Sequence, residues 1–284
     1  MKLKDVFEKS VQFFKDKKID TPRLDAELLI AHALKFDRVQ IYVKYEQPLS
    51  VSEVTACREL VRRRSQGEPV AYILGEKGFY GLLFNVGVGV LIPRPETEAI
   101  VEQALNFITK KKIENPRILD LGAGTGCIGF SILKNSPLAK LVSIEKSEQA
   151  FAFLESNLSK LELSDRATLI KDDVTKFEFS LLEPFDIIVS NPPYIAKNDP
   201  MTEAMVKKFE PSEALFANNN GLELVMKWSV QTKELLKSPG IMLFEIGHKQ
   251  GPTLKQHFEG LKVFSEVQII KDLSGLDRII KSVR

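Results

Sequence analysis

Arg117-Ile-Leu-Asp-Leu-Gly-Ala-Gly-Thr-Gly-Cys127 is the stretch of this sequence that decides its fold. Its first five residues form a short apolar run that is typical of a strand, and glycines follow at positions 122, 124 and 126. Glycines at alternate positions let the backbone turn sharply and approach a ligand closely. A helix that begins near Cys127 would present unpaired N–H groups to a carboxylate or phosphate. The stretch therefore predicts a strand, a ligand-binding turn and a helix.

The alternation of strand and helix continues downstream of this stretch. Further apolar runs, separated by helix-length segments, lie at residues 141–145, 167–170, 186–190 and 241–246. Such alternation is typical of a parallel sheet covered by helices on both faces. The last two apolar runs, 263–272 and 277–283, are too close together for a crossover helix. They predict an antiparallel terminal hairpin.

The N-terminal part of the chain has a different pattern. Apolar residues at helical spacing predict helices, and Thr21-Pro22 is typical of a helix start. Glycines interleave with Phe, Leu and Val between residues 72 and 92, which predicts short strands and turns. We therefore expect a helical domain at 1–70, a linker β-hairpin at 71–92 and an α/β domain at 93–284.

The composition excludes several classes of protein. Of the 284 residues, 44% are hydrophobic and 27% charged, which is typical of a globular protein with a buried core. A formal net charge of +2 disfavours a nucleic-acid-binding protein, and the basic cluster Arg62-Arg63-Arg64 ends a predicted helix, where cations complement the helix dipole. Cys57 and Cys127 lack the spacing of a disulfide framework or a zinc site. Because neither a secretory signal nor an apolar run of about 20 residues is present, we expect a cytoplasmic protein without membrane contact.

An adenosine-containing cofactor is the expected ligand of the glycine-rich turn. Glu145 ends the next strand, 19 residues after Gly126. An acid at this position can accept hydrogen bonds from ribose hydroxyls. The dinucleotide fingerprint GxGxxG lacks its third glycine when read from position 122, whereas Gly124, Gly126 and Gly129 satisfy it. The turn alone leaves NAD and other adenosine cofactors open.

Asn191-Pro-Pro-Tyr194 directly follows the apolar run 186–190. Each proline fixes its own φ and favours an extended conformation in the residue before it, so the tetrapeptide is stiff. It lies at the carboxyl end of a predicted strand, where open α/β sheets bind ligands. Asn supplies a carbonyl acceptor and Tyr a flat face. The combination suits a planar group that carries an NH₂.

These motifs together resemble the class I methyltransferases, which use S-adenosylmethionine to methylate a planar amino nitrogen. Two longer matches narrow the resemblance: Leu91-Ile-Pro-Arg-Pro-Glu-Thr-Glu98, and Asn191-Pro-Pro-Tyr-Ile195 followed by Glu210-Pro211 and Ala214-Leu215. They are similar to the HemK/PrmC family, the glutamine N5-methyltransferases that act on class I peptide-chain release factors. The similarity extends over nearly the whole chain from residue 22 onward.

The resemblance implies a Rossmann-like class I methyltransferase fold: a mostly parallel seven-stranded sheet with an antiparallel terminal strand, plus a small N-terminal helical domain that docks the protein substrate. The glycine-rich loop would hold the methionine moiety of S-adenosylmethionine, and of its product S-adenosylhomocysteine, while Glu145 would hold the ribose. The cofactor-binding residues expected are Asp120, Gly122, Ala123, Gly124, Thr125, Gly126, Glu145, Asp173, Val174 and Asn191. Val174 stands where the family often has an aromatic residue, and Glu145 where Asp is frequent.

The tetrapeptide would bind the substrate glutamine through Asn191, Pro192, Pro193 and Tyr194. Asn191, Pro192 and Tyr194 are the expected catalytic residues, and no metal is expected. An amide nitrogen is a poor nucleophile, so the main task is to align it with the methyl group and to favour pyramidal nitrogen as charge develops. We expect Asn191 Oδ1 and the Pro192 carbonyl to accept the amide hydrogens while Tyr194 forms a wall of the pocket. Glu245 is assigned no step.

Three alternatives to the release-factor activity stay open at this point. A sister enzyme that methylates glutamine on a ribosomal protein would share these motifs. An adenine-N6 methyltransferase would present the same four residues to a planar NH₂ on a nucleic acid. An NAD-dependent oxidoreductase would use the same loop and acid but gives the tetrapeptide no role. The release-factor reading predicts a monomer with a protein substrate and without nucleic-acid contact.

Overall fold

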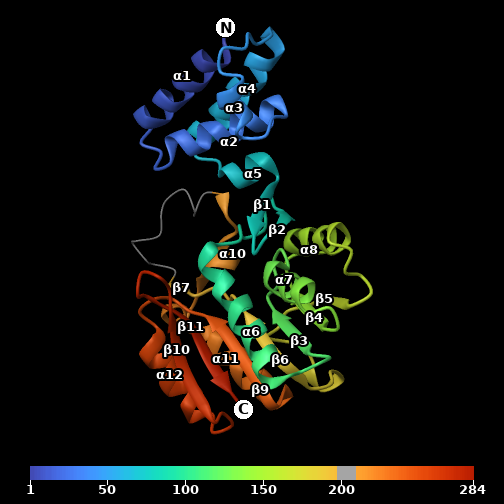
Figure 1. The fold of residues 1–284 in the computed structure, drawn as a ribbon. Helices are drawn as coiled ribbons and strands as arrows, with labels where there is room; N and C mark the ends of the chain where they lie inside the picture. The colour runs from blue at the N-terminus through green and yellow to red at the C-terminus, as the bar shows by residue number, and fades with distance from the viewer. Residues whose placement is uncertain (197–208) are drawn as a thin grey trace. The chain divides into compact units, whose positions relative to one another are not determined.

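The structure is a computed structural model, and it describes residues 1–196 and 209–284 (Figure 1). The described chain folds as two compact units. The first unit contains Met1–Glu76, and the second contains residues 77–196 and 210–284. Within the described residues, no helix has both the length and the apolar character that a membrane span requires.

The first unit is helical. Its helices are α1 (Leu3–Asp16), α2 (Pro22–Leu34), α3 (Gln40–Val43), α4 (Val51–Ser65) and α5 (Val70–Leu74). Pro22 occupies the first turn of α2, as the sequence predicts. Ser50 and Glu53 form a reciprocal capping box that starts α4. The apolar faces of these helices enclose a core that includes Phe7, Phe14 and Ile30.

The three arginines at the end of α4 each have an acidic partner. Arg62 pairs with Glu59, Arg63 with Glu68, and Arg64 with the buried carboxylate of Asp25 on α2 at 2.6 Å. The cluster is therefore part of the ion pairs of this helical unit and is not a free basic patch.

A hairpin of two short strands, β1 (Glu76–Phe79) and β2 (Leu82–Asn85), follows α5. Tyr80 and Gly81 form its tight turn and both have positive φ, which matches the right-handed twist of the flanking strands.

The second unit is built on a seven-stranded sheet. Its strands are β3 (Arg117–Leu121), β4 (Lys140–Glu145), β5 (Ala167–Lys171), β6 (Phe185–Ser190), β9 (Leu236–Glu245), β10 (Glu266–Lys271) and β11 (Asp277–Val283). They lie in the order β10-β11-β9-β6-β3-β4-β5. All pairs from β9 to β5 are parallel, and β11 pairs antiparallel with both β9 and β10. The predicted fold class is confirmed.

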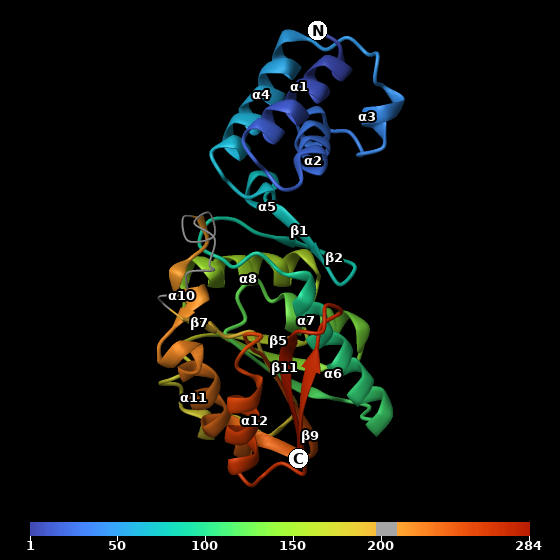
Figure 2. The same cartoon turned by 90° about the vertical axis from the view of Figure 1, so that its left-hand side faces the viewer.

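Helices cover both faces of this sheet, as Figures 1 and 2 show. The helices are α6 (Glu98–Lys111), α7 (Cys127–Asn135), α8 (Glu148–Lys160), α11 (Glu223–Thr232) and α12 (Gly251–Gly260). Ile118, Ile187 and Ile241 face α6, α7 and α8 in one core, whereas the next residue of each strand faces α11 and α12 in the other. Strands buried on both faces require continuous apolar runs, which is why the sequence revealed them.

The shorter elements of the second unit connect this framework. They are η1 (Pro95–Thr97), η2 (Phe179–Leu181), β7 (Ile195–Ala196), α10 (Ser212–Leu215), β8 (Phe216–Ala217), η3 (Asn219–Gly221) and η4 (Lys233–Leu235). Strands β7 and β8 pair in parallel. Because β3, β4, β5, β6 and β9 run in one direction, their carboxyl ends meet at one edge of the sheet. The glycine-rich loop, Glu145 and the tetrapeptide 191–194 all begin at this edge.

Candidate active site

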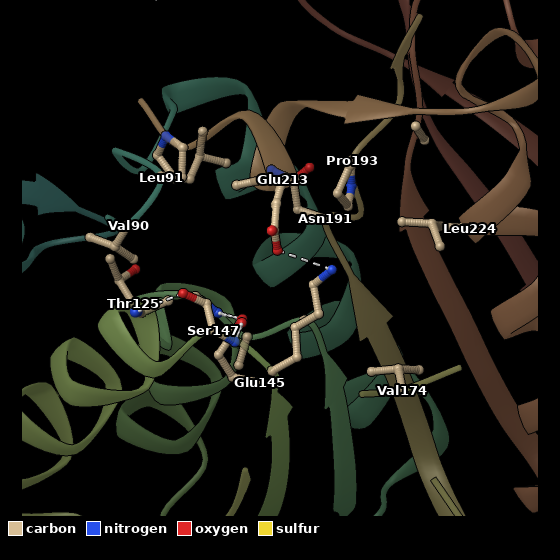
Figure 3. Close-up of a pocket in the computed structure, with 18 of the residues that line it drawn as sticks. Val90, Leu91, Thr125, Glu145, Ser147, Val174, Asn191, Pro193, Glu213 and Leu224 are labelled. Atoms are coloured by element: carbon tan, nitrogen blue, oxygen red, sulfur yellow. Dashed lines mark hydrogen bonds and ion pairs between the residues drawn. The ribbon is translucent and has the colours of Figure 1, made fainter. Parts of the chain in front are cut away.

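A cavity of about 1130 Å³ opens at the carboxyl edge of the sheet. Typical ligand pockets measure about 300–1,000 Å³, so this one has room for a cofactor and a substrate side chain together. Figure 3 shows Glu145 and Ser147 on one side of it and Asn191 and Pro193 on another. Further walls come from residues 173–175, residues 211–218 and helix α11. Every lining residue among those that the structure describes belongs to the second unit.

The glycine-rich loop forms the floor of this cavity. Gly122, Gly124 and Gly126 all have positive φ. A Cβ at Gly124 would have only Val90 as a neighbour, at 3.9 Å, whereas a Cβ at Gly126 would lie 2.4 Å from Phe130. Gly124 therefore keeps the cavity open, and Gly126 lets the start of α7 pack against the core. Gly122, Ala123, Gly124 and Thr125 line the cavity, and Gly126 does not.

Glu145 is fixed by backbone donors at the end of β4. Its Oε2 accepts from the Gly124 N–H at 2.9 Å, and its Oε1 accepts from the Ser147 N–H at 2.8 Å. The residue is 7% exposed and lines the cavity. Each carboxylate oxygen has a second lone pair, so the fixed group can accept hydrogen bonds from two hydroxyls of a ligand.

Asp120 lies behind the loop, outside the cavity wall. It is 1% exposed, its Oδ2 accepts from the Gly129 N–H at 3.1 Å, and its Oδ1 has no partner among the residues described. Burial raises the pKa of Asp120 to about 7. The structure thus does not place Asp120 where it could touch a ligand in the cavity, and its hydrogen bond to Gly129 connects the end of β3 to α7.

Asp173 and Val174 line the cavity next to the end of β5. Asp173 Oδ1 accepts from the backbone N–H of Thr175 at 2.8 Å and from its hydroxyl at 2.7 Å. This leaves Oδ2 available to a ligand NH₂. Val174 is 3% exposed and packs in the same core cluster as Trp228, which also lines the cavity. Trp228 thus has both a packing position and a place in the cavity wall.

The tetrapeptide begins where β6 ends. Asn191 and Pro193 line the cavity, whereas Pro192 is buried and, like Tyr194, is not among the lining residues. The Tyr194 hydroxyl donates to Glu245 Oε1 at 2.9 Å. The Tyr194 carbonyl accepts from Gln250 Nε2, also at 2.9 Å. Tyr194 therefore anchors the tetrapeptide, and the structure does not show it as the wall that the sequence predicted.

Thr97 and Glu245 complete the site, and sequence reasoning gave neither a role. Asn191 Nδ2 donates to Thr97 Oγ1 at 3.2 Å, and the Thr97 hydroxyl donates to Glu245 Oε2 at 2.6 Å. Both Thr97 and Glu245 are 2% exposed. Burial raises the pKa of Glu245. The one sequence signal that pointed to a role for Glu245 was its position as an acid within the otherwise apolar run 241–246.

The two longer segments that carried the resemblance meet in this unit. Arg94 Nη2 donates to Glu210 Oε1 at 2.5 Å, and the Ile92 N–H donates to Glu210 Oε2 at 3.4 Å. The Glu210 side chain is 3% exposed, so Arg94 supplies the charge partner of a buried carboxylate. Arg94 also lines the cavity.

An ion pair spans the cavity between Lys146, next to Glu145, and Glu213 on α10, with Nζ and Oε2 3.3 Å apart (Figure 3). Both side chains are substantially exposed, so the pair contributes little stability.

The site as a whole combines the glycine-rich loop, the fixed carboxylate of Glu145 and the amide oxygen of Asn191 around one cavity. This arrangement suits an adenosine cofactor next to a planar NH₂ group.

Two family models match the chain. The PrmC N-terminal domain matches residues 5–75, and the methyltransferase small domain matches residues 102–246. A release factor glutamine methyltransferase from Chlorobaculum tepidum is 37% identical, over 96% of this chain and 94% of its own length. One from Rhodopirellula baltica is 35% identical, over 97% of this chain and 94% of its own length.

The fold is also that of a solved structure. The N-terminal domain of human METTL16 in complex with SAH superposes with a TM-score of 0.52 at 18% identity, and the match covers 72% of this chain and 76% of that one. At this identity the likeness concerns the fold alone. The full-length relatives and both domain matches lead to the assignment: the chain belongs to the HemK/PrmC family of S-adenosylmethionine-dependent release factor glutamine methyltransferases.

Proposed function

We propose that this protein transfers a methyl group from S-adenosylmethionine to the side-chain amide nitrogen (N5) of the glutamine in the Gly-Gly-Gln motif of class I peptide-chain release factors. The full-length relatives carry release factor glutamine methyltransferase as their name. The single observation that supports the chemistry is Asn191. Its Nδ2 is occupied by Thr97, which leaves Oδ1 as an acceptor at the cavity that the glycine-rich loop also lines.

The residues present fit S-adenosylmethionine. Gly122 to Thr125 form a cradle with room at Gly124, where a side chain would intrude. Glu145 would accept from the ribose hydroxyls, Asp173 from the adenine amino group, and Val174 would pack on the adenine ring. When bound, S-adenosylmethionine supplies a methyl group activated by a positively charged sulfur.

The tetrapeptide then orients the glutamine amide. Asn191 Oδ1, which lines the cavity, accepts one of its two hydrogens, so that its nitrogen points toward the methyl group. The Pro192 carbonyl is the expected second acceptor, although Pro192 is buried and does not line the cavity, so it requires the glutamine to reach the backbone behind Asn191. An acceptor at this position also stabilises the positive charge that develops on nitrogen. The carboxylate that holds Tyr194, Glu245, already accepts from two hydroxyls, so the proton passes to water after transfer without a dedicated base.

The helical first unit has a separate role in this proposal. It matches the PrmC N-terminal domain, and we expect it to dock the release factor. The described residues that line the cavity all come from the second unit, and we expect a monomeric enzyme. We expect the reaction to take place in the cytoplasm, together with the release factor.

A labelling experiment tests this function. The protein is incubated with a purified class I release factor and methyl-labelled S-adenosylmethionine. The release factor is then digested, and the labelled peptide is identified. We expect label on the Gly-Gly-Gln glutamine and none on a release factor whose glutamine is replaced by alanine. Label found only on a ribosomal protein or on nucleic acid would assign the enzyme to one of those substrates instead.

The variant Asn191→Ala connects the activity to the site. It should lower kcat by about 10²–10³-fold, the loss typical of one preorganised polar contact in a transition state. Its affinity for S-adenosylhomocysteine should change little, because the cradle and Glu145 are intact. Asn135→Ala is the matched control, since the Asn135 amide donates only to the Ser131 carbonyl within α7, outside the cavity lining. Near-normal turnover by Asn191→Ala would remove Asn191 from the mechanism.

A further inference from the structure

Glu245 is a buried acid whose partners are hydroxyl groups. It ends β9, and it is 2% exposed. Within the two described stretches of the chain, no Lys, Arg or His side chain lies within ion-pair distance of its carboxylate. Burying a carboxylate without a cation is costly, so such a group is retained for a specific arrangement of donors. The donors here are the hydroxyls of Thr97 and Tyr194.

The hydrogen bond from Thr97 to Glu245 determines the direction of the hydrogen bond between Asn191 and Thr97. A threonine hydroxyl has one proton, and Thr97 gives it to Glu245 Oε2 at 2.6 Å. Thr97 Oγ1 can therefore only accept from Asn191 at 3.2 Å, so the group that faces it must be the Asn191 NH₂. While Glu245 is ionised, the amide orientation follows from this proton count.

The consequence for the site is that Asn191 Oδ1 is left free. No residue in the described part of the chain donates to it, and Asn191 lines the cavity. If Glu245 instead donated to Thr97, the Thr97 proton would turn to Asn191 Oδ1. The Asn191 NH₂ would then face the substrate amide, and two donors would oppose each other.

The other oxygen of the same carboxylate holds the far end of the tetrapeptide. Tyr194 donates its hydroxyl proton to Glu245 Oε1 at 2.9 Å. Between Asn191 and Tyr194 lie Pro192 and Pro193, each with a fixed φ. The Glu245 carboxylate thus holds both ends of this stiff four-residue corner, Tyr194 directly and Asn191 through Thr97.

We infer that Glu245 is a positioning residue of this enzyme, which acts through Thr97 to hold Asn191 with its acceptor oxygen toward the substrate amide and through Tyr194 to hold the corner in place. This inference rests on the proposed methylation of a glutamine amide. It assigns Glu245 and Thr97 no contact with the substrate. Their effect is to set which atom of Asn191 the substrate meets.

Thr97 offers the cleanest test, because two substitutions separate its hydroxyl from its shape. Thr97→Val removes the hydroxyl and keeps the branched side chain, whereas Thr97→Ser keeps the hydroxyl. We expect Thr97→Val to lower kcat for release-factor methylation by about 10–100-fold, the loss typical of removing a group that orients an active-site residue. Thr97→Ser should stay within about threefold of the wild type, since it can form both hydrogen bonds.

Glu245→Gln tests the carboxylate itself with little change in volume. A glutamine can accept from one hydroxyl but must donate to the other, so one end of the corner loses its acceptor. We expect a loss in kcat at least as large as that of Thr97→Val. The double variant should lose no more than Glu245→Gln alone, because both changes break one network.

The control and the second readout separate positioning from folding. Thr232→Val removes an equally buried hydroxyl, which donates to the Trp228 carbonyl in α11, and should leave kcat within about twofold. The dissociation constant for S-adenosylhomocysteine, measured by calorimetry on each full-length variant, should stay within about twofold of the wild type. A role that is only structural would weaken this binding together with kcat and would not distinguish Thr97→Ser from Thr97→Val.

Each outcome decides the inference. If the wild type methylates the release factor and both Thr97→Val and Glu245→Gln turn over normally, the inference is wrong and the proposed function stands. If the wild type binds S-adenosylhomocysteine but does not methylate the release factor, the proposed function is wrong, and the inference that rests on it is wrong as well. If Glu245→Gln does not fold, the Thr97 pair decides alone.

Discussion

Two buried carboxyl groups, Glu145 and Glu245, shape the carboxyl edge of this sheet through different donors. Glu145 accepts from the backbone N–H groups of Gly124 and Ser147, so it fixes the loop for which we propose contact with the cofactor. Glu245 accepts from side-chain hydroxyls and so fixes the corner for which we propose contact with the substrate. At the scale of single residues, the two halves of the site have separate supports.

The state of Glu245 predicts how activity depends on pH. Burial is the main reason that the pKa of Glu245 is raised, and Glu96 adds to the rise, while Thr97, Tyr194 and Arg278 oppose it. Above this pKa the carboxylate accepts from both hydroxyls, and below it the protonated group must donate. We therefore expect kcat to be constant above the raised pKa and to fall by up to about tenfold per pH unit below it.

This profile is measured at saturating cofactor and release factor between pH 5 and 8. Cys127 also faces Glu245, and burial raises the pKa of its thiol to about 12, outside this range. The pKa of Tyr194 is likewise raised, chiefly by burial. An acid limb that is absent from the wild type, or that persists unchanged in Glu245→Gln, would contradict this assignment.

Single residues also show where sequence reasoning ends. Local motifs predicted Asn191, Glu145 and the glycine-rich loop at one cavity, because each follows a strand of a parallel sheet. Thr97 and Glu245 could not be predicted as a pair, since 148 positions separate them and only tertiary folding brings them together. The position of the Tyr194 ring was also not predictable, because it depends on Glu245.

At the scale of elements, the strands were predictable where an apolar run ends at a glycine or a polar residue. The run 117–121 is β3 itself, and the run 186–190 is β6 apart from Phe185. Strand β9 begins at Leu236, five residues before its apolar run, because Lys237, Ser238 and Pro239 interrupt the pattern. The placement of β11 between β9 and β10 results from long-range pairing that no local pattern encodes.

A glycine in η3 predicts a coupling between a turn and the tetrapeptide. Gly221 has φ +84°, and a Cβ there would lie 1.8 Å from the Tyr194 carbonyl oxygen. Gly221→Ala must therefore displace the corner as well as strain its own backbone. We expect it to lower the Tm and to lower kcat, measured by thermal unfolding and by release-factor methylation.

Gly275→Ala is the control for the strain alone. Gly275 has φ +78° in the β10–β11 turn, and a Cβ there would meet nothing within 4 Å. Its cost should be that of a left-handed residue, about 1–2 kcal/mol, or a fall in Tm of about 2–8 °C, with kcat unchanged. Equal effects of the two substitutions on Tm and on kcat would show that the contact with Tyr194 does not matter.

At the scale of the whole molecule, chemistry and docking are assigned to different units. The described lining of the cavity belongs to the second unit, and the first unit is a helical body with its own core. The balanced charge of the chain and the paired arginines of α4 agree with a protein substrate better than with a nucleic acid.

The most direct test of the account is a crystal structure of the protein with S-adenosylhomocysteine and a peptide that contains Gly-Gly-Gln. We predict that the glutamine amide nitrogen lies about 2.7–3.2 Å from Asn191 Oδ1 and faces the homocysteine sulfur. We also predict that Asn191 Nδ2 stays on Thr97. An Asn191 side chain that points away from the sulfur, or a glutamine bound elsewhere, would contradict the central claim.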